Sequence, residues 1–405
     1  MNNLTDSLKM IKEVAFPSPG KIVLMVIDGL GGLPDLETGK TELETASLPN
    51  LDNLAAEGAS GLTDPVAPGI TPGSSVGHLA LFGYDPVRYN IGRGILEAVG
   101  IDLKLQPGDV AARGNFCTLD ENGRITDRRA GRVSNQKSTE LCRMLDGQSA
   151  GDVEIIVRPV REHRFVAIFR GPGLAPEVSD SDPQQLDVPP KSITALNPEA
   201  EVMAGVANRF LAQAKETLAA HHPANMALLR GFSRHPDFPS MNEIYKLKPA
   251  AIASYPMYRG LAKLVGMEVL PTGATIREEF DTLKQHYADY DFFFLHMKGT
   301  DSAGEDGDFK RKVAVLEQID GFIPELKKLN PDVIVVAGDH STPATLAAHS
   351  WHPVPVLLHS LWCRRDGVSS FSESACTAGG LGRFPATQIM PLAMANALKL
   401  TKFGA

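Results

Sequence analysis

Side chains of the kind that hold divalent metal ions recur beside short apolar runs of this chain. The runs are Lys21–Ile27 (KIVLMVI), Asp291–Leu295 (DFFFL), Asp332–Ala337 (DVIVVA) and Pro353–Leu358 (PVPVLL). The polar residues beside them are Asp28, Asp301, Asp339, His340 and His349. Carboxylate and imidazole groups are ligands for Mg²⁺, Mn²⁺ and Zn²⁺. Any one of them alone is typical of a turn cap or a core hydrogen bond, and the residues by themselves leave that reading open.

A second feature that could do chemistry is the segment Gly69–Pro86, GITPGSSVGHLALFGYDP. Ser74 or Ser75 stands at the start of an apolar, helix-like stretch, where serine ordinarily serves as an N-cap. The functional alternative is a nucleophile in the positive field of a helix N-terminus, activated by a metal. Gly73 and Gly77 would let a phosphate approach the backbone. The segment alone does not decide between the two.

The apolar runs predict buried strands that bring these polar residues to one sheet edge. Ligands bind at the carboxyl edge of open α/β sheets. Between two of the runs, Lys310–Leu329 has apolar residues at helical spacing, which predicts a strand–helix–strand crossover and a largely parallel sheet. A further helix is expected to begin at Pro49 and end at Gly58. We assign residues 1–107 and 243–405 to one discontinuous α/β domain.

The middle of the chain, residues 108–242, is different in pattern. Short strand-like runs (ARGNFCTL, EIIVRPV, RFVAIFRG) alternate with Gly, Asp and Pro turns, and PEVSDSDPQQLDVPPKS is rich in turn formers. This pattern predicts an α+β insertion that interrupts the α/β domain.

Composition narrows the classes of function. The 405 residues carry a formal charge of −8, which disfavours a broad nucleic-acid surface but allows a local basic pocket for an anionic metabolite. The apolar runs are too short to span a membrane, and the first residues are not typical of a secretory signal. Four cysteines without paired spacing indicate reduced thiols. We expect a cytoplasmic protein without nucleic-acid or membrane partners, and its oligomeric state is open.

Longer motifs carry a resemblance to a known family. VIDGLGG, TPGSSVGHLALFGYDP, IGRGILEAVGI, GNFCTLDENGRITDRRAGR, EHRFVAIFRG, HMKGTDSAG, AGDHSTP and AHSWHPVPVLL resemble, in order, the archaeal-type cofactor-independent phosphoglycerate mutases of the alkaline phosphatase superfamily. The resemblance implies an alkaline-phosphatase-like fold with the insertion as a substrate-binding lid. It also implies interconversion of 3-phosphoglycerate and 2-phosphoglycerate through a phosphoserine, without 2,3-bisphosphoglycerate.

The resemblance also implies the roles of individual residues. The nucleophile falls on Ser74, and two divalent metal ions are implied. The ligands of one metal would be Asp28, Ser74, Asp339 and His340. The ligands of the other would be Asp301, His349 and the residue four after Asp301.

That last position departs from the family, which has histidine where this chain has Glu305. A carboxylate is a harder donor and adds a negative charge, so Mn²⁺ or Mg²⁺ would be favoured, with Zn²⁺ possible. The alternative is a second metal site that is weakened or empty.

Basic residues in family-like motifs are candidates to bind the substrate, since arginine offers a bidentate fork to phosphate and carboxylate. They are Arg128, Arg129 and Arg132 in DRRAGR, His163 and Arg164 in REHRF, and Arg93 and Lys298. Each is also typical of a surface ion pair. Rival functions are a metal-dependent phosphatase, a phosphonate hydrolase, another small-molecule phosphotransferase, and a catalytically inert binding protein.

Overall fold

The computed structural model describes residues 3–89, 91–234 and 239–404, and of residues 3–7 the backbone only. The chain divides into two compact units, one formed by Met1–Asn90 with Phe238–Ala405 and the other by Ile91–Asp237. The second unit begins earlier than the insertion expected at residue 108. The reason is helix α5 (Arg93–Gly100), which buries Ile95 and Leu96 and packs on strands of the second unit.

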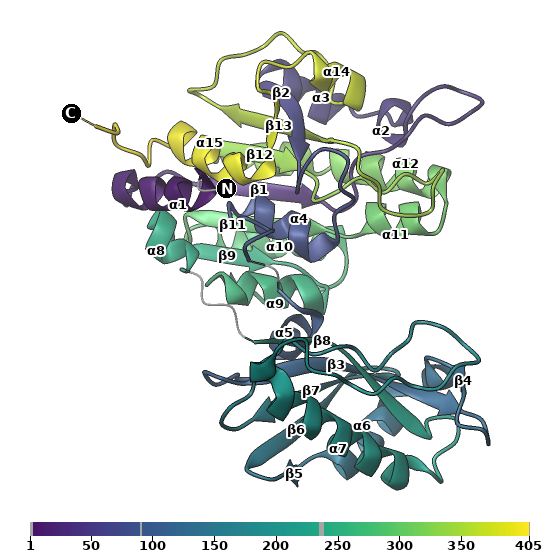
Figure 1. The fold of residues 1–405 in the computed structure, drawn as a ribbon. Coiled ribbons are helices and arrows are strands. Elements are labelled where there is room, and N and C mark those ends of the chain that lie inside the picture. The colour runs from purple at the N-terminus through teal and green to yellow at the C-terminus, as the bar shows by residue number, and fades with distance from the viewer. Residues whose placement is uncertain (1–2, 90, 235–238, 405) are drawn as a thin grey trace. The chain divides into compact units, whose positions relative to one another are not determined.

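The first unit is built on an eight-stranded sheet in the order β10-β9-β11-β1-β12-β13-β2-β14 (Figure 1). Its strands are β1 (Ile22–Ile27), β2 (Ala59–Asp64), β9 (Pro249–Ile252), β10 (Glu268–Val269), β11 (Phe292–Met297), β12 (Val333–Ala337), β13 (Val354–Ser360) and β14 (Gly382–Pro385). β1 pairs in parallel with β11 on one side and with β12 on the other. Only β13 runs antiparallel, against β12 and β2. The predicted α/β class with a mostly parallel sheet is confirmed.

Helices pack on both faces of this sheet, as expected for strands that are apolar throughout. They are α1 (Asn3–Val14), α2 (Glu42–Thr45), α3 (Pro49–Ala56), α4 (Ser74–Leu81), α8 (Met241–Tyr245), α9 (Pro256–Leu264), α10 (Ile276–His286), α11 (Gly299–Glu305), α12 (Phe309–Asp320), α13 (Ile323–Lys328), α14 (Glu373–Thr377), α15 (Ile389–Asn396) and the 3-10 turn η3 (Ala386–Gln388). One face packs Val23, Met25 and Phe293 against α3, α10, α12 and α13. The alternate residues Phe294 and His296 contact α4 and α9.

The helix predicted over 310–329 is two helices. α12 ends at Asp320 and α13 begins at Ile323, with Gly321 and Phe322 between them. Pro324 lies in the first turn of α13, where its missing N–H is no loss. Apolar spacing runs through both helices, so periodicity alone does not reveal the break. The helix expected from Pro49 is present as α3, which ends at Ala56.

The second unit is an α+β fold on an antiparallel sheet in the order β4-β3-β7-β6-β5, with β8 also paired to β3. Its strands are β3 (Val110–Leu119), β4 (Ile125–Asp127), β5 (Gln148–Ala150), β6 (Val153–Arg161), β7 (Arg164–Arg170) and β8 (Met226–Arg234). Its remaining helices are α6 (Asn135–Leu145), α7 (Glu201–Leu218) and the 3-10 turns η1 (Ala130–Arg132) and η2 (Pro198–Ala200).

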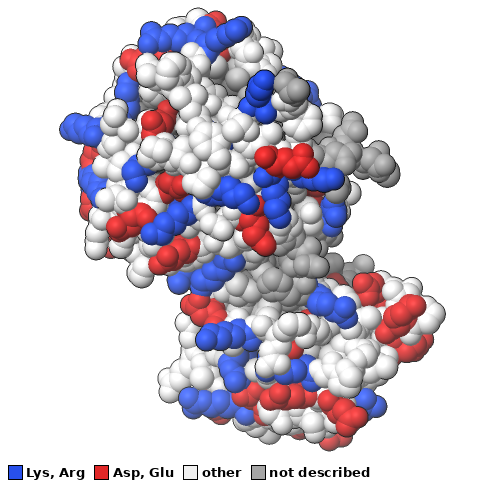
Figure 2. Space-filling view, turned by 90° about the vertical axis from the view of Figure 1, so that its left-hand side faces the viewer, with Lys and Arg blue, Asp and Glu red and all other residues white. Residues whose placement is uncertain are grey.

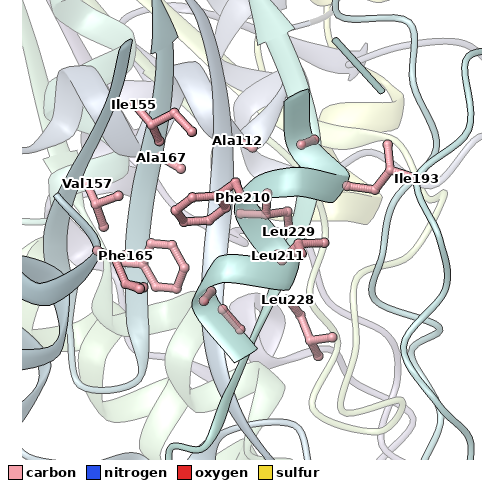
Figure 3. Close-up of a cluster of buried hydrophobic side chains, with 14 of the residues drawn as sticks. Ala112, Ile155, Val157, Phe165, Ala167, Ile193, Phe210, Leu211, Leu228 and Leu229 are labelled. Atoms are coloured by element: carbon pink, nitrogen blue, oxygen red, sulfur yellow. The ribbon is translucent and has the colours of Figure 1, made fainter. Parts of the chain in front are cut away.

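Helix α7 closes the core of this unit. Its side chains Phe210 and Leu211 lie against Phe165 of β7 and Leu228 and Leu229 of β8 (Figure 3). All five residues are almost completely buried. The core of the second unit is therefore continuous from α7 across the sheet.

Charged side chains of both signs are interspersed on the face drawn in Figure 2. Among the described residues, no helix is both long enough and apolar enough to cross a membrane.

Candidate active site

The polar residues predicted to meet at one sheet edge do so in the first unit. Asp28 follows β1, Asp339 and His340 follow β12, and Asp301 lies in α11 just after β11. Because β13 runs antiparallel, the segment before it, with His349, comes to the same edge. Ligand atoms of Asp28, Asp339 and His340 lie within 4.8 Å of one another, and so do those of Asp301, His340 and His349. The two groups share His340.

Asp28 is completely buried and is held by three donors on one of its two oxygens. Its Oδ2 accepts a hydrogen bond from Tyr258 Oη at 2.5 Å and lies 3.2 Å from His296 Nε2 and 3.1 Å from Lys298 Nζ. Its Oδ1 is buried, has no hydrogen-bond partner, and lies 3.4 Å from His340 Nε2. One carboxylate oxygen is therefore fixed by the protein while the other is left for another group.

The two carboxylate oxygens of Asp339 also differ from each other, one being hydrogen-bonded and the other not. Its Oδ1 accepts the backbone N–H of Gly29 at 3.1 Å, and its buried Oδ2 has no hydrogen-bond partner although it lies 3.1 Å from both His78 Nδ1 and His340 Nε2. Burial would raise the pKa of Asp339, but His340 and His78 hold it well below its usual range. The carboxyl group is therefore ionised and under-coordinated.

Thr342 determines which nitrogen of His340 faces these oxygens. Thr342 Oγ1 lies 2.8 Å from Asp301 Oδ1 and 2.9 Å from His340 Nδ1. Asp301 can only accept, so the single hydroxyl proton goes to Asp301 and Thr342 accepts from the Nδ1–H of His340. Nε2 is then the ring nitrogen of His340 that faces Ser74 Oγ and the unpartnered oxygen of Asp339. An imidazole nitrogen that lies within 4.8 Å of buried carboxylate oxygens without hydrogen-bond partners is the kind of donor set that a divalent cation binds, so these residues fit a metal ion.

His349 belongs to the second group. Its ring stacks on that of His340 with centroids 3.7 Å apart, its Nδ1 lies 3.0 Å from the carbonyl oxygen of Pro72, and its Nε2 lies 3.5 Å from Asp301 Oδ1. Burial alone would lower the pKa of His349, but Asp301 and the Pro72 carbonyl raise it to about 9. Burial likewise opposes ionisation of Asp301, but His349 and Lys298 lower its pKa.

Glu305 ends α11 with its side chain 55% exposed. Its Oε1 lies 3.7 Å from His349 Nε2. Two donors that each lie about 2.1 Å from one ion can be no more than about 4.2 Å apart. The separations of 3.5 and 3.7 Å from His349 to Asp301 and Glu305 are within this limit. Glu305 can therefore reach the same cation from the solvent side, and its ligand role remains a prediction.

Ser74 is not the N-cap of α4. Gly73 occupies that position, and no side chain caps the helix. Ser74 begins the helix, and its Oγ lies 3.1 Å from His340 Nε2. The hydroxyl is thus beside the first group of ligands and in the field of the helix N-terminus.

Two glycines allow these segments to approach each other. A Cβ on Gly77 of α4 would lie 2.1 Å from the carbonyl oxygen of Asp339. Gly29 has φ +65°, and a Cβ there would lie 2.6 Å from Thr342 Oγ1 and 2.9 Å from Asp301. Only residues without a side chain let α4 and the loop after β1 pack against the metal-ligand segments.

Lys298 contacts one carboxylate of each ligand group, Asp28 of the first and Asp301 of the second. Its ammonium contacts Asp301 Oδ2 and lies 3.1 Å from both Asp28 Oδ2 and Tyr258 Oη. Burial disfavours its charge, but Asp28 and Asp301 outweigh burial and raise its pKa. A permanent positive charge therefore stands beside the proposed metal positions, with a quarter of the side chain exposed.

In the second unit, four arginines form a cluster with a shortage of carboxylates: Arg93 and Arg164, which were predicted from the sequence, and Arg113 and Arg230, which were not. Arg113 and Arg230 are directly paired across β3 and β8, an arrangement in which like charges repel. Burial first, and then the other arginines, lower the pKa of Arg113 to about 10. Its nearest carboxylate, on Glu97, is 3.6 Å away.

Buried donors in this cluster point to an anion. The side chain of Arg113 is 13% exposed, and its buried Nε has no hydrogen-bond partner; the buried Nε of Arg164 has none either. Guanidinium groups with unused donors and repelling neighbours are suited to a dianionic ligand. The sequence signal for the missed pair was an arginine inside each of two apolar strands.

The comparisons with known proteins agree with this geometry. The family model for 2,3-bisphosphoglycerate-independent phosphoglycerate mutase matches residues 55–225. Probable enzymes of this name are 50% identical over 403 residues in Thermotoga maritima and 49% over 405 residues in Thermus thermophilus, covering 99% of this chain and all of each relative. The chain belongs to this family.

The chain is also similar to two solved structures. The cofactor-independent phosphoglycerate mutase from Thermoplasma acidophilum is 31% identical, with a TM-score of 0.74 over 93% of this chain and 100% of that one. The PH0037 protein from Pyrococcus horikoshii is 30% identical, with a TM-score of 0.82 over 95% and 99%. The fold is thus that of a mutase of this type.

The other predicted basic residues of this family member differ in their surroundings. Arg128 donates to both oxygens of buried Asp182 at 2.9 and 2.6 Å, so its fork is already engaged. His163 is buried, and burial together with Arg164 lowers its pKa to about 4, which keeps the ring neutral at pH 7. Arg129 and Arg132 have exposed side chains.

Sequence reasoning also missed the residues that hold the ligands of the first unit. His78, Tyr258, His296 and Thr342 are buried around Asp28 and Asp339. The rings of Tyr258 and His296 stack with centroids 3.9 Å apart. His78 lies four residues after Ser74 on α4, which places it on the same helix face. That spacing was a sequence signal for His78, and the place of His296 directly after the apolar run DFFFL was a signal for His296.

Proposed function

We propose that the chain interconverts 3-phosphoglycerate and 2-phosphoglycerate through a phosphoserine on Ser74. The observation that carries this proposal is the position of Ser74 Oγ, 3.1 Å from His340 Nε2 and beside buried carboxylates with unpartnered oxygens. A hydroxyl at that place has both the nucleophile's geometry and an electrostatic environment that a phosphoryl group and cations would complete.

Ser74 Oγ attacks the phosphorus of 3-phosphoglycerate in line. A bond forms between Oγ and phosphorus, and the bond from phosphorus to the C3 oxygen breaks, leaving glycerate and phosphoserine. The C2 hydroxyl oxygen of the same glycerate then attacks the phosphoserine and regenerates Ser74. The ammonium of Lys298, kept protonated by Asp28 and Asp301, neutralises charge on the transferring oxygens.

Two divalent metal ions are part of the proposal. One would be held by Asp28, Ser74, Asp339 and His340. The other would be held by Asp301, Glu305 and His349. When bound there, the ions would lower the pKa of the serine hydroxyl and neutralise phosphoryl oxygens. Because most ligands are carboxylates, we propose Mn²⁺ or Mg²⁺ over Zn²⁺. We also propose that no 2,3-bisphosphoglycerate is needed, since serine carries the phosphoryl group.

Arginines of the second unit would bind the anionic groups of the substrate. Arg113 and Arg164 each have a buried Nε without a hydrogen-bond partner, and the like charges of the four arginines Arg93, Arg113, Arg164 and Arg230 repel one another, which a dianion would relieve. Arg128, Arg129, Arg132 and His163 remain predicted contributors. For a mutase, glycerate must stay bound and water must be kept from the phosphoserine until the second transfer. The second unit, in its predicted role as a lid, would do both. A well-oriented hydroxyl, with an effective molarity of about 10⁵ M or more, outcompetes water at about 55 M. We expect the reaction to take place in the cytoplasm.

A product assay tests the proposal. With Mn²⁺ and 3-phosphoglycerate, 2-phosphoglycerate should form at a rate far above that of free phosphate, and Ser74→Ala should remove both products. Free phosphate as the main product would identify a phosphatase, and no product under any metal condition would indicate a binding protein.

A further inference from the structure

Lys312 is a completely buried lysine that no step of the proposed reaction uses. It lies on α12, and its Nζ donates to two backbone carbonyl oxygens, those of Gly31 and Thr342, each at 2.9 Å. A buried ammonium is costly unless it is paired and fully hydrogen-bonded, so its retention here requires a specific arrangement of acceptors.

Both carbonyls belong to the loops that carry the proposed ligands. Gly31 is three residues after Asp28, and its oxygen also accepts the backbone N–H of Thr342 at 3.0 Å. Thr342 is two residues after His340, and its hydroxyl orients both His340 and Asp301. The ammonium of Lys312 thus joins the loop after β1 to the loop after β12, at the residue that aligns ligands of both metal groups.

Two carboxylates, buried Glu42 and half-buried Glu373, accept hydrogen bonds from N–H groups of the same loops. Glu42 Oε1 accepts the N–H of Ala344 at 2.7 Å and lies 3.8 Å from Lys312 Nζ. Glu373 Oε1 accepts the N–H of Gly32 at 2.8 Å, while its Oε2 accepts from Thr41 Oγ1 at 2.7 Å. The three side chains, Lys312, Glu42 and Glu373, come from α12, α2 and α14, and we name them the loop clamp.

We propose that Lys312 is a positioning residue for the metal site, and that the loop clamp sets the spacing between Asp28 on one side and His340 with Asp301 on the other. This inference rests on the proposed function, since it concerns the same metal ions. Without the ammonium, the carbonyl of Thr342 loses this donor, and near Thr342 the two loops keep the direct bond from its N–H to the Gly31 oxygen, with the bond from Gly29 N–H to Asp339 further along. Thr342 can then move, and the hydroxyl that orients His340 and Asp301 moves with it.

The test is direct Mn²⁺ binding by isothermal titration calorimetry to the full-length protein, in the absence of substrate. Lys312→Met keeps the aliphatic stem and removes the ammonium. Groups that orient metal ligands typically account for about 10–100-fold in metal affinity, and we expect a loss of that size. Lys312→Arg, which keeps a charged donor, should recover part of it. At saturating Mn²⁺ the KM for 3-phosphoglycerate should stay near that of the wild type.

A second buried lysine provides a matched control. Lys399 is equally buried, and its Nζ donates to the carbonyl oxygen of Ser18 and to Asp291, next to the opposite end of β11. Lys399→Met should lower the stability of the fold in the same way while leaving the Kd for Mn²⁺ unchanged. A general effect of losing a buried ammonium would weaken Mn²⁺ binding equally in both variants and would overturn the inference.

The remaining outcomes are equally decisive. If the wild type binds two Mn²⁺ ions and Lys312→Met binds them with the same Kd, the positioning role is wrong while the metal site stands. If the wild type itself binds no Mn²⁺, the proposed metal site fails and the inference fails with it. Should Lys312→Met not fold, Glu42→Gln replaces it. That variant removes the charge that balances the ammonium, and it should show a loss of Mn²⁺ affinity that Lys399→Met does not show; an unchanged Kd overturns the role.

Discussion

Replacing Arg113 by methionine should stabilise the protein and weaken its binding of substrate. Arg113 is directly opposite Arg230 and close to Arg93 and Arg164, with burial and these charges lowering its pKa from 12.5 to about 10. That difference corresponds to roughly 3 kcal/mol of unfavourable free energy for the charged side chain in the folded chain. Methionine keeps much of the buried stem and removes the charge. After the loss of the contact with Glu97, we expect a gain of about 1–2 kcal/mol in the free energy of unfolding.

The effect on substrate has the opposite sign. A hydrogen bond to a charged group contributes about 1.5–3 kcal/mol, so the KM for 3-phosphoglycerate should rise about 10–100-fold in Arg113→Met. Urea unfolding of the substrate-free protein measures the first quantity and initial rates measure the second. 3-Phosphoglycerate should also raise the unfolding midpoint of the wild type more than that of the variant.

Arg170 is the control for this prediction, because it lies in the same sheet but has a partner. It donates to both oxygens of buried Asp109 at 3.0 and 2.8 Å. Arg170→Met leaves that carboxylate unpaired, so it should destabilise the protein by about 3 kcal/mol or more without changing KM. If Arg113→Met loses stability as Arg170→Met does, and its KM is unchanged, the arginine cluster is not a substrate site.

Four further predictions concern the first unit. Ser74→Ala should abolish turnover with the fold intact while Ser75→Ala keeps substantial activity, and intact-mass spectrometry after addition of 3-phosphoglycerate should place a phosphoryl adduct on Ser74; an adduct on Ser75 would overturn the assignment. Glu305→Ala should lose one metal equivalent and most of the activity, and Glu305→His should restore metal binding with a shift in preference toward Zn²⁺. Elemental analysis measures the metal content beside turnover. An unchanged metal stoichiometry in Glu305→Ala would make Glu305 a solvated loop residue. Exhaustive chelation should stop turnover and added 2,3-bisphosphoglycerate should not change it, so activity that persists in chelator contradicts the chemistry. In the metal-free protein, the contact with Asp301 outweighs the burial of His349 and raises its pKa to about 9, so the stability contributed by the protonated ring is complete below pH 6.5 and is lost as the pH rises through 9. Denaturant unfolding of the chelated protein should therefore give a lower free energy of unfolding at pH 9.5 than at pH 6 for the wild type, and this contribution should be missing in His349→Ala. An equal change between the two pH values in both proteins would refute the prediction.

The edge of the parallel sheet was predictable because strand ends are local features of the sequence. An apolar run that stops at Asp28 or at Asp339 and His340 defines where its strand ends, and parallel pairing with β1 brings those ends together. The antiparallel direction of β13 was not predictable in this way. His349 lies at the same sheet edge as the other proposed ligands because it precedes the antiparallel strand β13 and does not follow it.

The residues around the ligands were not predictable because their contacts join distant segments. Tyr258 is 230 positions from Asp28, whose oxygen it binds. Arg113 and Arg230 face each other only because β3 and β8 pair antiparallel in one particular register. No local pattern contains such a register. An arginine within an apolar strand is a signal that something compensates its charge, but the sequence does not say what.

Neither the metal-ligand cluster of the first unit nor the arginine cluster of the second is an arrangement that selection for stability alone would favour. Arginines elsewhere in the chain show the arrangement that does favour stability. Where an arginine of this chain is paired with a buried carboxylate, as Arg128 and Arg170 are, the carboxylate accepts from two nitrogens of the guanidinium. In the arginine cluster the carboxylate contacts are longer, 3.6 Å from Arg113 to Glu97 and 3.7 Å from Arg230 to Asp182. In the first unit, Asp28 and Asp339 each keep a buried oxygen without a hydrogen-bond partner. The first unit thus has buried carboxylate oxygens that lack a cation, and the second has guanidinium groups that lack an anion. An enzyme that uses metal ions on an anionic substrate requires unsatisfied groups of both kinds. Removing either of these unsatisfied sets of groups by mutation should therefore raise the stability of the fold while lowering activity.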